Sequence, residues 1–345
     1  MCANMKLGIV GCGMVADEHL RALRKVSGIQ VAAACDRDEK ALERLSRKWN
    51  IKSRYTDLDK MLDNQDLSMI SVLTPPQSHV PIALEAIKRG VHVIVEKPLT
   101  TTVEAAQPLM DALAKTHVKL TVDHIMLFSK VMMRAINLVK EGAVGNVLNA
   151  EIAYLVPPND AMTSNPNHWS HALPGGRIGE MLPHPIYAVQ SMAGNELSVD
   201  QVVTDKCGDY PWMKHDELKA LLRGKEGSGS IYVSFNSPRP ATNMTVYGTK
   251  AILKIDIINQ TIMQLQPKGF SKVDSARDLL GQSGNLFLAV VRNTIDFLGA
   301  KAMEYPLRNL YASFMTNVAT GTDPIVTPKM AYETVRITED ICKQI

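Results

Sequence analysis

Short apolar runs and longer amphipathic stretches alternate through the first 122 residues. The apolar runs are rich in β-branched residues and lie at 6–10, 30–35, 68–73, 92–95 and 118–122, with a weaker candidate at 52–55. The stretches between them have apolar residues at helical spacing and lie at 16–26, 39–49, 80–89 and 103–114. Because strands covered on both faces are apolar throughout, and helices connect parallel strands, this pattern predicts a doubly wound α/β domain.

The pattern changes after about residue 123. A predicted helix over 130–141 leads into a strand over 147–156, and a loop rich in Pro, Asn and Ser follows over 157–176. Later segments alternate apolar and polar residues, at 230–235, 243–247, 251–257 and 261–266. Alternation indicates strands with one buried face, and hence an antiparallel sheet. Helical stretches end the chain, over 285–298, over 307–320 and after residue 327. We therefore predict a first domain over residues 1–122 and a second, α+β domain over 123–345.

The composition narrows the functional classes. The 345 residues carry 38 Lys and Arg against 35 Asp and Glu, a net charge of +3, so the chain lacks the basic field that nucleic-acid binding requires. The longest apolar run has about six residues, whereas a membrane-spanning helix needs about 20. We recognise no secretory signal at the amino terminus. Five scattered cysteines form no CxxC pair, which argues against a disulfide framework and a zinc site and favours the cytoplasm.

A glycine-rich turn joins the first predicted strand to the first predicted helix. In a GxGxxA turn the first glycine permits a tight bend, the second lets the backbone approach a pyrophosphate, and the small last residue lets the helix pack on the strand. The free amides at the start of the helix then face the phosphate charge. The place between a strand and a helix therefore predicts a dinucleotide site. Its residues are Gly11, Cys12, Gly13, Met14, Val15 and Ala16.

An acidic residue ends the second predicted strand. Asp36 lies 25 positions beyond Gly11, near the offset at which a carboxylate accepts hydrogen bonds from the adenosine ribose. The alternative is that Asp36 caps the next helix. A carboxylate here repels a 2′-phosphate and favours NAD, whereas Arg37 could meet a phosphate and leaves NADP open. We predict NAD as the cofactor, with NADP as the alternative.

Several segments carry a resemblance to a known family. They are the GxGxxA turn, the Thr74–His79 segment TPPQSH, the stretch ALEAIKRGVHVIVEKPLT that contains Glu96-Lys97-Pro98, and a later YGTKAILKID. With them the chain resembles the glucose-fructose oxidoreductase, inositol dehydrogenase and MocA (Gfo/Idh/MocA) family over nearly its whole length, most strongly over residues 6–100. The resemblance implies a Rossmann domain and a second domain with a large open antiparallel sheet. It also implies NAD(P)-dependent oxidation or reduction of sugars or cyclitols, and homodimers or homotetramers that assemble through that sheet.

Candidate site residues follow the carboxyl ends of predicted strands, where ligands of doubly wound sheets bind. Lys97 precedes a proline, which stiffens its backbone, and its ammonium group can donate to a substrate hydroxyl and take part in proton transfer. The alternative is an exposed structural lysine. The resemblance places Glu96 beside the nicotinamide ribose. It also places Thr74, Pro76 and His79 along the cofactor channel, although His79 could instead cap the next helix. The residues that follow strand ends are Thr74, Glu96, Lys97 and Asp123.

The family's second catalytic sequence is GG followed by DxxxH, and this chain has GG followed by ExxxH over residues 175–184. By resemblance, His184 is the base that takes a hydroxyl proton as the hydride leaves, a task that suits an imidazole. The alternative is a buried structural histidine. Glu180 takes the acidic position, and four-residue spacing on one helix would put it on the same face as His184. Because Pro183 and Pro185 interrupt such a helix, we expect a helix to begin only near Pro183.

Residues in the preceding loop complete the predicted substrate site. His168, Trp169 and His171 lie in a region that in relatives reaches toward substrate, with simple exposure of the histidines as the alternative. The spacing of these histidines from Glu180 and His184 matches no familiar ligand pattern, so we predict no metal ion.

Three functions are open at this point. The first is hydride transfer between nicotinamide and a carbinol carbon of a sugar-like small molecule, with Lys97 and His184 handling the hydroxyl proton. The second keeps the cofactor but uses transient oxidation to permit elimination or glycoside cleavage without net redox change. The third is a dinucleotide-binding sensor without catalysis, which would need neither Lys97 nor His184.

Overall fold

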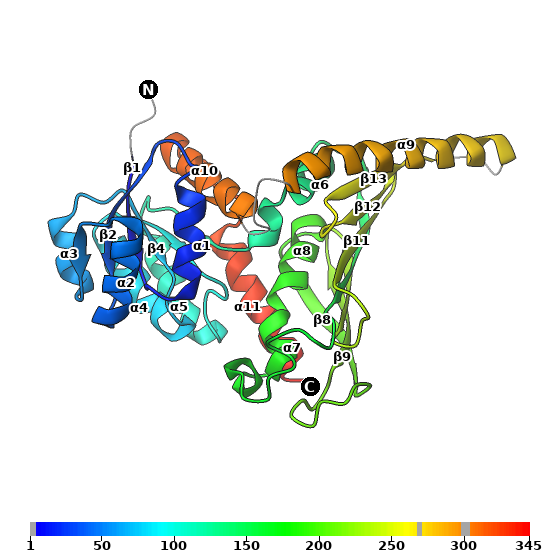
Figure 1. Ribbon diagram of the computed structural model, residues 1–345. Coiled ribbons are helices and arrows are strands. Elements are labelled where there is room, and N and C mark those ends of the chain that lie inside the picture. Colours follow the sequence, from blue (N-terminus) through cyan, green and yellow to red (C-terminus); the bar gives the residue numbers. More distant parts are fainter. Residues whose placement is uncertain (1–4, 268–270, 298–303) are drawn as a thin grey trace. The chain divides into compact units, whose positions relative to one another are not determined.

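The computed structural model describes residues 5–267, 271–297 and 304–345. These residues form two compact units. The first unit consists of the described residues within Met1–Phe128 and Lys301–Val335, and the second of those within Ser129–Ala300 and Arg336–Ile345. Figure 1 labels most of the helices and many of the strands.

The first unit is built on a six-stranded sheet with the order β3-β2-β1-β4-β5-β6, in which every neighbouring pair is parallel. The strand order reverses between β1 and β4, and ligands of doubly wound sheets bind at such a switch point. Each strand falls on a predicted apolar run, so the doubly wound α/β prediction is confirmed. The strands are β1 (Met5–Val10), β2 (Ile29–Cys35), β3 (Ser53–Tyr55), β4 (Met69–Val72), β5 (His92–Val95) and β6 (Leu120–Val122).

Helices connect these strands. They are α1 (Met14–Leu23), α2 (Glu39–Trp49), α3 (Leu58–Asn64), α4 (His79–Lys88) and α5 (Val103–Leu113). The bounds of α2 match the prediction, since the Asp38 carboxylate accepts hydrogen bonds from the backbone N–H groups of Lys40 and Ala41 and fixes its start. Helix α3 was not predicted. It buries only Met61 and Leu62, which is too few positions for a periodic signal.

One further helix joins the first unit from late in the chain. Helix α10 (Glu304–Thr320) packs against α1 and against the short 3₁₀ helix η2 (Ile125–Phe128). The first unit therefore includes residues 123–128 and 304–335, which the predicted division at residue 122 gives to the second domain. The spacing within α10 predicts a helix but does not say which surface it covers. Its buried face includes Leu307, Leu310, Tyr311 and Phe314.

The second unit is built on a seven-stranded sheet with the order β13-β12-β11-β7-β10-β9-β8. All neighbouring pairs are antiparallel except β7 and β10, which run parallel. The predicted α+β unit with a mostly antiparallel sheet is confirmed, although strands β8 and β9 were not predicted. The strands are β7 (Val147–Leu155), β8 (Leu197–Asp205), β9 (Glu217–Gly224), β10 (Ser228–Ser234), β11 (Ala241–Gly248), β12 (Ile252–Asp256) and β13 (Thr261–Leu265).

Helices of the second unit cover one face of this sheet. Helix α8 (Pro183–Ala193) packs on β7 and β10, and α6 (Lys130–Lys140) packs on β12 and β13. Along β9, buried Leu218 and Ala220 alternate with exposed Lys219 and Leu221, so the other face is open. The remaining elements are η3 (Trp169–Ala172), α7 (Gly176–Met181), α9 (Lys272–Phe297) and α11 (Pro328–Cys342), whose last residues belong to this unit.

Helix α9 is 26 residues long and packs on β13. In Figure 1 it extends beyond the labelled strands of its unit. It begins 13 residues before the predicted start at Asn285, and the predicted end at Leu298 lies outside the described residues. Many of its large apolar side chains are exposed, a property taken up below. They are Val273, Leu279, Leu280, Leu286, Phe287, Leu288, Val290 and Val291.

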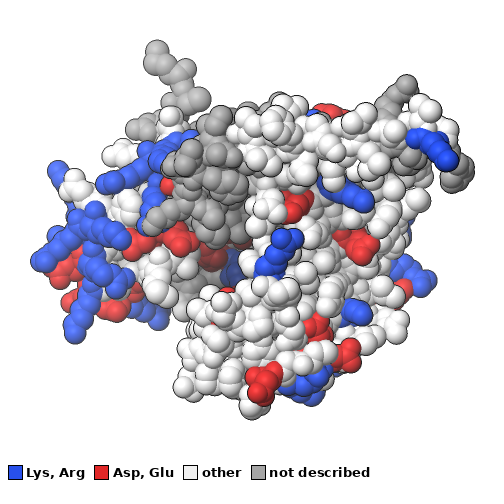
Figure 2. All heavy atoms as spheres, turned by 45° about the vertical axis from the view of Figure 1, so that its right-hand side comes forward, with Lys and Arg blue, Asp and Glu red and all other residues white. Residues whose placement is uncertain are grey.

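Charged side chains of both signs are intermixed on the face of the molecule that Figure 2 shows. This agrees with the near balance of charge in the sequence, which argued against a polyanion partner. Within residues 5–267, 271–297 and 304–345, no helix combines the length and the apolar character that crossing a bilayer requires.

Candidate functional site

The glycine-rich turn lies between β1 and α1, at the carboxyl edge of the parallel sheet. Gly11 has φ 97°, and a Cβ there would lie 2.7 Å from the backbone carbonyl of Leu73, so only glycine fits. The turn is held from two sides. The backbone N–H of Cys12 donates to Asp36 Oδ2 at 2.6 Å, and Arg44 Nη2 donates to the Cys12 carbonyl at 2.9 Å.

The start of α1 fits a dinucleotide phosphate. Gly13 is the N-cap of α1, and a Cβ at this position would have no heavy atom within 4 Å. Since no described side chain caps the helix, its first amides can face an anion. Met14 and Val15 are 89% and 43% exposed beside them, which leaves their side chains accessible to a bound cofactor.

Asp36 is positioned by the same turn. Its two carboxylate oxygens accept hydrogen bonds from the backbone N–H groups of Cys12 and Asp38. Each oxygen has a second lone pair, so the carboxylate can also accept ribose hydroxyls. The N-cap of α2 is Asp38 rather than Asp36, so the helix-cap alternative does not apply. Arg37 is exposed next to it.

His79 joins two loops at this edge of the sheet. Its imidazole is fully buried, with Nε2 2.7 Å from the Thr74 carbonyl and Nδ1 3.0 Å from the Pro98 carbonyl. Burial holds the pKa of His79 below its usual value despite these carbonyl contacts. Thr74 Oγ1 accepts a hydrogen bond from Ser78 Oγ, and Pro76 begins the 3₁₀ helix η1 (Pro76–Ser78). Any effect of His79 on a cofactor would therefore act through the two loops it connects.

Glu96 and Lys97 follow β5 at the same edge, and Lys97 is half-buried. The backbone N–H of Lys97 donates to Glu96 Oε2 at 3.0 Å. The Lys97-Pro98 peptide bond is cis. Glu96 Oε1 lies 2.9 Å from Nε2 of His19, a buried residue of α1. The turn thus holds a carboxylate fixed by hydrogen bonds next to a lysine at the ligand-binding edge.

One group of described side chains has the residue types that a metal ion would need. His19, Glu96 and Asp123 each offer one ligand atom, and these atoms lie within 4.8 Å of one another. In the structure these groups contact each other, since Glu96 Oε1 lies 2.9 Å from His19 Nε2 and Asp123 Oδ2 lies 3.6 Å from the same nitrogen. We treat this group as a hydrogen-bonded network, and the absence of a metal stays a prediction.

The GG sequence of the second unit starts helix α7. Gly175 and Gly176 have φ 70° and 59°, a left-handed turn that favours glycine. Helix α7 ends at Met181, and α8 begins at Pro183 in agreement with the predicted start. Glu180 and His184 therefore belong to two different helices, so the one-helix spacing argument does not apply to them.

His184 lies in the first turn of α8. The residues around it in this helix are buried, whereas His184 is half-buried. Its Nδ1 lies 2.8 Å from the hydroxyl of Tyr187, which is fully buried. The ring stacks on Tyr154, with ring centroids 5.9 Å apart. Burial and the nearby Glu180 carboxylate raise the pKa of Tyr154 to about 12, so this ring is a neutral phenol.

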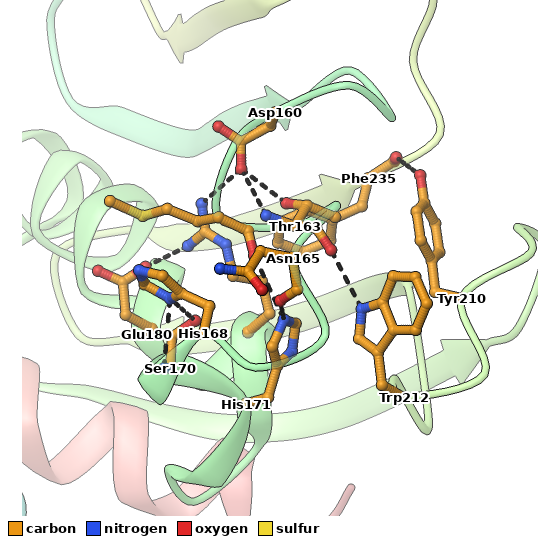
Figure 3. Close-up of polar contacts among 12 residues, drawn as sticks. Asp160, Thr163, Asn165, His168, Ser170, His171, Glu180, Tyr210, Trp212 and Phe235 are labelled. Carbon is orange, nitrogen blue, oxygen red and sulfur yellow. Dashed lines mark hydrogen bonds and ion pairs between the residues drawn. The ribbon is translucent and has the colours of Figure 1, made fainter.

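Glu180 forms an ion pair with Arg177, whose side chain is 2% exposed. Nη2 of Arg177 also lies 3.3 Å from Asp160 Oδ2, and its guanidinium group lies over the Phe235 ring at 5.4 Å. Asp160 in turn accepts hydrogen bonds from the backbone N–H and hydroxyl of Thr163 (Figure 3). A buried guanidinium group with two carboxylate partners gives Glu180 a structural role, and its catalytic role stays a prediction.

The histidines of the preceding loop make local contacts. His168 Nδ1 bonds to Ser170 and caps η3, while His171 Nε2 faces the carbonyl oxygens of Met162 and Asn165 (Figure 3). Trp169 is 59% exposed. These contacts favour a part for the two histidines in shaping the loop, and Trp169 is the most accessible predicted substrate contact of the three.

Sequence reasoning missed several residues that surround the candidate residues in each unit. His19 could have been noticed as a polar residue on the buried face of α1, between Ala16 and Leu20. Arg177 directly follows the GG pair, so a cationic side chain next to this motif could have been noticed. The sequence offers no local signal for Tyr311, because its partner His19 lies 292 positions away.

Two protein-family models together match most of the chain. A model described as "Oxidoreductase family, NAD-binding Rossmann fold" matches residues 5–124, and one described as "GFO/IDH/MocA C-terminal domain" matches residues 132–254. Oxidoreductase P35 of Formosa agariphila is 24% identical over 270 residues, 76% of this chain and 82% of that protein. Glycosyl hydrolase family 109 protein 1 of Shewanella sp. (strain ANA-3) is 25% identical over 160 residues, which are 44% of this chain and only 35% of that protein.

Solved structures share the fold over almost the full chain. An oxidoreductase from Agrobacterium radiobacter in complex with NAD+, L-tartaric acid and magnesium aligns with a TM-score of 0.79 at 17% identity, covering 99% of this chain and 98% of that one. The scyllo-inositol dehydrogenase from Lactobacillus casei with bound NAD(H) and scyllo-inositol aligns with a TM-score of 0.76 at 16% identity, covering 99% and 96%. At these identities the likeness establishes the fold.

Proposed function

Because the chain belongs to the GFO/IDH/MocA family of oxidoreductases and has its NAD-binding Rossmann domain, we propose that it transfers a hydride between nicotinamide and a carbinol carbon of a sugar, cyclitol or sugar derivative. The observation that carries the proposal is the turn after β5. There a half-buried lysine, Lys97, follows a carboxylate that is fixed by hydrogen bonds, at the ligand-binding edge of the sheet. A protein that only bound dinucleotides would not need this lysine.

In the proposed reaction the nicotinamide ring, when bound, accepts or returns the hydride. Lys97 donates a hydrogen bond to the reacting oxygen, orients it and takes part with His184 in moving its proton. His184 takes the hydroxyl proton as the carbon is oxidised, and the contact between its Nδ1 and the Tyr187 hydroxyl orients the ring. Glu180 supports this half of the site through its ion pair with Arg177, and Trp169, His168 and His171 shape the substrate loop.

The substrate class is supported by proteins of the same fold. One structure of this fold contains scyllo-inositol and another L-tartaric acid, and both ligands carry carbinol groups. The deciding experiment incubates the purified protein with panels of sugars, cyclitols and nucleotide sugars, with NAD and with NADP. Formation of reduced nicotinamide with a member of the panels, followed by absorbance, would support the dehydrogenase. The absence of both reduced nicotinamide and glycoside products with either cofactor would favour the non-catalytic sensor.

A second candidate is NAD-dependent elimination or glycoside cleavage. One observation favours it, namely the local similarity to a glycosyl hydrolase family 109 protein, although this chain spans only 35% of that relative. Hydride would leave and return in each cycle, so product would form from a glycoside without net NADH. Chromatography of the glycoside products beside the absorbance assay separates the two candidates.

We expect the Asp36 carboxylate to set the choice of cofactor. In Asp36→Ser the hydrogen bonds to the ribose hydroxyls are lost and the repulsion of a 2′-phosphate disappears, so KM for NAD should rise about ten- to hundredfold while discrimination against NADP falls. Asp38→Asn is the matched control, because Asp38 is a neighbouring carboxylate that caps α2. Steady-state KM values with both cofactors test this expectation. An unchanged NAD to NADP preference would refute the role of Asp36.

We also propose that the protein forms homodimers or homotetramers, in the cytoplasm. Free thiols at Cys12, Cys35, Cys207 and Cys342 support a reducing compartment. The resemblance implied assembly through the sheet, and the exposed apolar residues of α9, which packs on β13 of that sheet, offer a second surface for self-association. Val273, Leu280 and Phe287 recur every seven residues, a spacing that puts them on one face of the helix. Large exposed apolar patches mark interaction surfaces, and the same patch on two copies can pair about a twofold axis.

Two charges on this face should weaken the assembly. We expect Leu280→Asp combined with Phe287→Asp to shift the protein to a smaller species in sedimentation velocity, because each carboxylate would be buried without a partner. Asp274→Ser is the control, since helical geometry turns Asp274 about 100° away from Val273. An oligomer of unchanged mass in the double variant would show that α9 is not the interface.

A further inference from the structure

Buried polar side chains gather beneath the turn that carries Glu96 and Lys97. His19 is 1% exposed, Asp123 3%, and Ser71 and Tyr311 are fully buried. They come from separate parts of the first unit: α1, the residue after β6, β4 and α10. Burying a polar group costs free energy unless it has a hydrogen-bond partner. The partners of these side chains therefore indicate which of them carry protons.

A chain of hydrogen bonds leads from β4 to Glu96. Ser71 Oγ lies 2.8 Å from the Tyr311 hydroxyl, which lies 2.7 Å from His19 Nδ1. His19 Nε2 lies 2.9 Å from Glu96 Oε1. Since an ionised carboxylate only accepts, we assign the proton of this contact to Nε2. Glu96 thus receives hydrogen bonds from His19 and from the backbone N–H of Lys97.

Asp123 adds a second carboxyl group to the same place. Its Oδ2 is 3.6 Å from His19 Nε2, and the ligand atoms of His19, Glu96 and Asp123 all lie within 4.8 Å of one another. Two ionised carboxylates this close in a buried place would repel each other strongly, so we expect one of them to hold a proton. Burial and the adjacent Glu96 raise the pKa of Asp123 well above its usual value. Although burial opposes it, the hydrogen bond from His19 and the charge of Lys97 hold the pKa of Glu96 below its usual value.

We propose that Asp123 is a neutral carboxylic acid that keeps its proton and donates a hydrogen bond to Glu96. His19 and Asp123 are then positioning residues that hold Glu96 as a fixed anion next to Lys97. The buried pair then carries one negative charge rather than two. Only the expected effect on turnover rests on the proposed function, because the protonation of Asp123 can be measured in the resting protein.

The groups that face Asp123 are known from the structure. They are Glu96 and Lys97 after β5, His19 from α1 and Tyr311 from α10. A variant that changes Asp123 alone leaves these four groups in place. Comparison of that variant with the wild type therefore isolates the titration of Asp123 from theirs.

Asp123→Asn provides this comparison, because an amide N–H replaces the acid O–H as donor and does not titrate. Unfolded Asp123 ionises near pH 4, whereas the folded acid keeps its proton, so wild-type unfolding above about pH 4 releases a proton. Raising the pH then weakens the wild type relative to the variant until the folded acid itself ionises. Between pH 5 and 6 we expect a tenfold relative shift of the unfolding equilibrium, measured by urea denaturation of the full-length protein.

Infrared difference spectra give a direct second measurement. Wild type minus Asp123→Asn should show the carbonyl band of a protonated carboxyl group at pH 7. Asp66→Asn, which changes a carboxylate with a 97% exposed side chain, should show no such band and no change in the pH dependence of unfolding. Equal pH dependence in wild type and Asp123→Asn, or no protonated band, would overturn the proposal. A stoichiometric divalent metal ion that is lost in Asp123→Asn would also overturn it, because the cation would replace the proton.

Turnover with a substrate from the panels tests the positioning role. Asp123→Asn should keep kcat/KM within about threefold of wild type, whereas Asp123→Leu, which has no donor, should lower kcat about ten- to hundredfold with little change in NAD affinity. If Asp123→Leu does not fold, Tyr311→Phe is the alternative variant, since it removes only the hydroxyl that bonds to His19. A drop in kcat without a matching rise in the Kd for NAD is expected. An Asp123→Asn variant that loses activity as fully as Asp123→Leu would refute the role of the proton donor.

Discussion

Replacing Lys97 by alanine is expected to lower kcat by about 10²- to 10⁴-fold, the usual contribution of a positioned proton-transfer group. Lys97 follows β5 at the carboxyl edge of the sheet, and the fixed Glu96 carboxylate accepts a hydrogen bond from its backbone. The glycine-rich turn and Asp36 do not depend on the lysine side chain. The Kd for NAD, measured by titration calorimetry, should therefore stay within about threefold.

Two further variants make the test of Lys97 specific. Lys88→Ala removes an exposed lysine that pairs with Glu85 on α4, and it should leave turnover unchanged. Lys97→Arg keeps a positive charge but replaces a compact ammonium with a planar guanidinium group that does not lose its proton, so it should restore little activity. Wild-type kcat in Lys97→Ala would show that the assignment is wrong.

His184→Gln should lower kcat/KM by a similar factor, about 10²- to 10⁴-fold, because glutamine can hydrogen-bond but cannot carry a proton away. His184 is the half-buried residue in the otherwise buried start of α8, and Tyr187 and Tyr154 set the plane of its ring. Steady-state kinetics across pH measure the effect. The acid limb of the wild-type profile that depends on the base should be absent in the variant.

Variants around His184 separate catalysis from loop structure. Tyr187→Phe removes the hydroxyl at Nδ1 and should reduce kcat/KM by only about three- to tenfold, the worth of one neutral hydrogen bond. His168→Ala and His171→Ala should chiefly change KM for the substrate, because both residues bond within the loop. If either loop histidine proves essential for kcat while His184→Gln remains active, the base has been assigned to the wrong residue.

The elements that carry the candidate dinucleotide residues could be predicted closely from sequence because their signals are local. The turn at Gly11, the strand end at Asp36 and the Glu96-Lys97-Pro98 sequence each lie next to the element that positions them, so short-range patterns were enough. The same reason explains the matching bounds of β5 and α2. Where a cap or a continuous apolar run defines an element, the neighbouring residues carry the information.

The side-chain partners of the candidate residues could not be predicted, because most of them lie far away in the sequence or on another element. His19 bonds to Tyr311, which lies 292 positions later, and no periodicity in the sequence predicts this contact. The helix start at Pro183 could be predicted from the two prolines, whereas the ion pair that Glu180 forms with Arg177 could not be predicted from the ExxxH spacing. Strand β9 is a different case, because its alternation of buried and exposed residues was readable and our prediction overlooked it.

The return of α10 to the first unit has a practical consequence for dissecting the protein. A recombinant fragment that stops at Phe128 would keep all six parallel strands but would lack the helix that covers α1 and η2. It would expose the apolar surface on which Leu310 and Phe314 pack, and His19 would lose the phenol at its Nδ1. The nucleotide-binding half cannot be obtained by a single cut, and a graft onto another scaffold would have to carry residues 304–320 through an engineered linker.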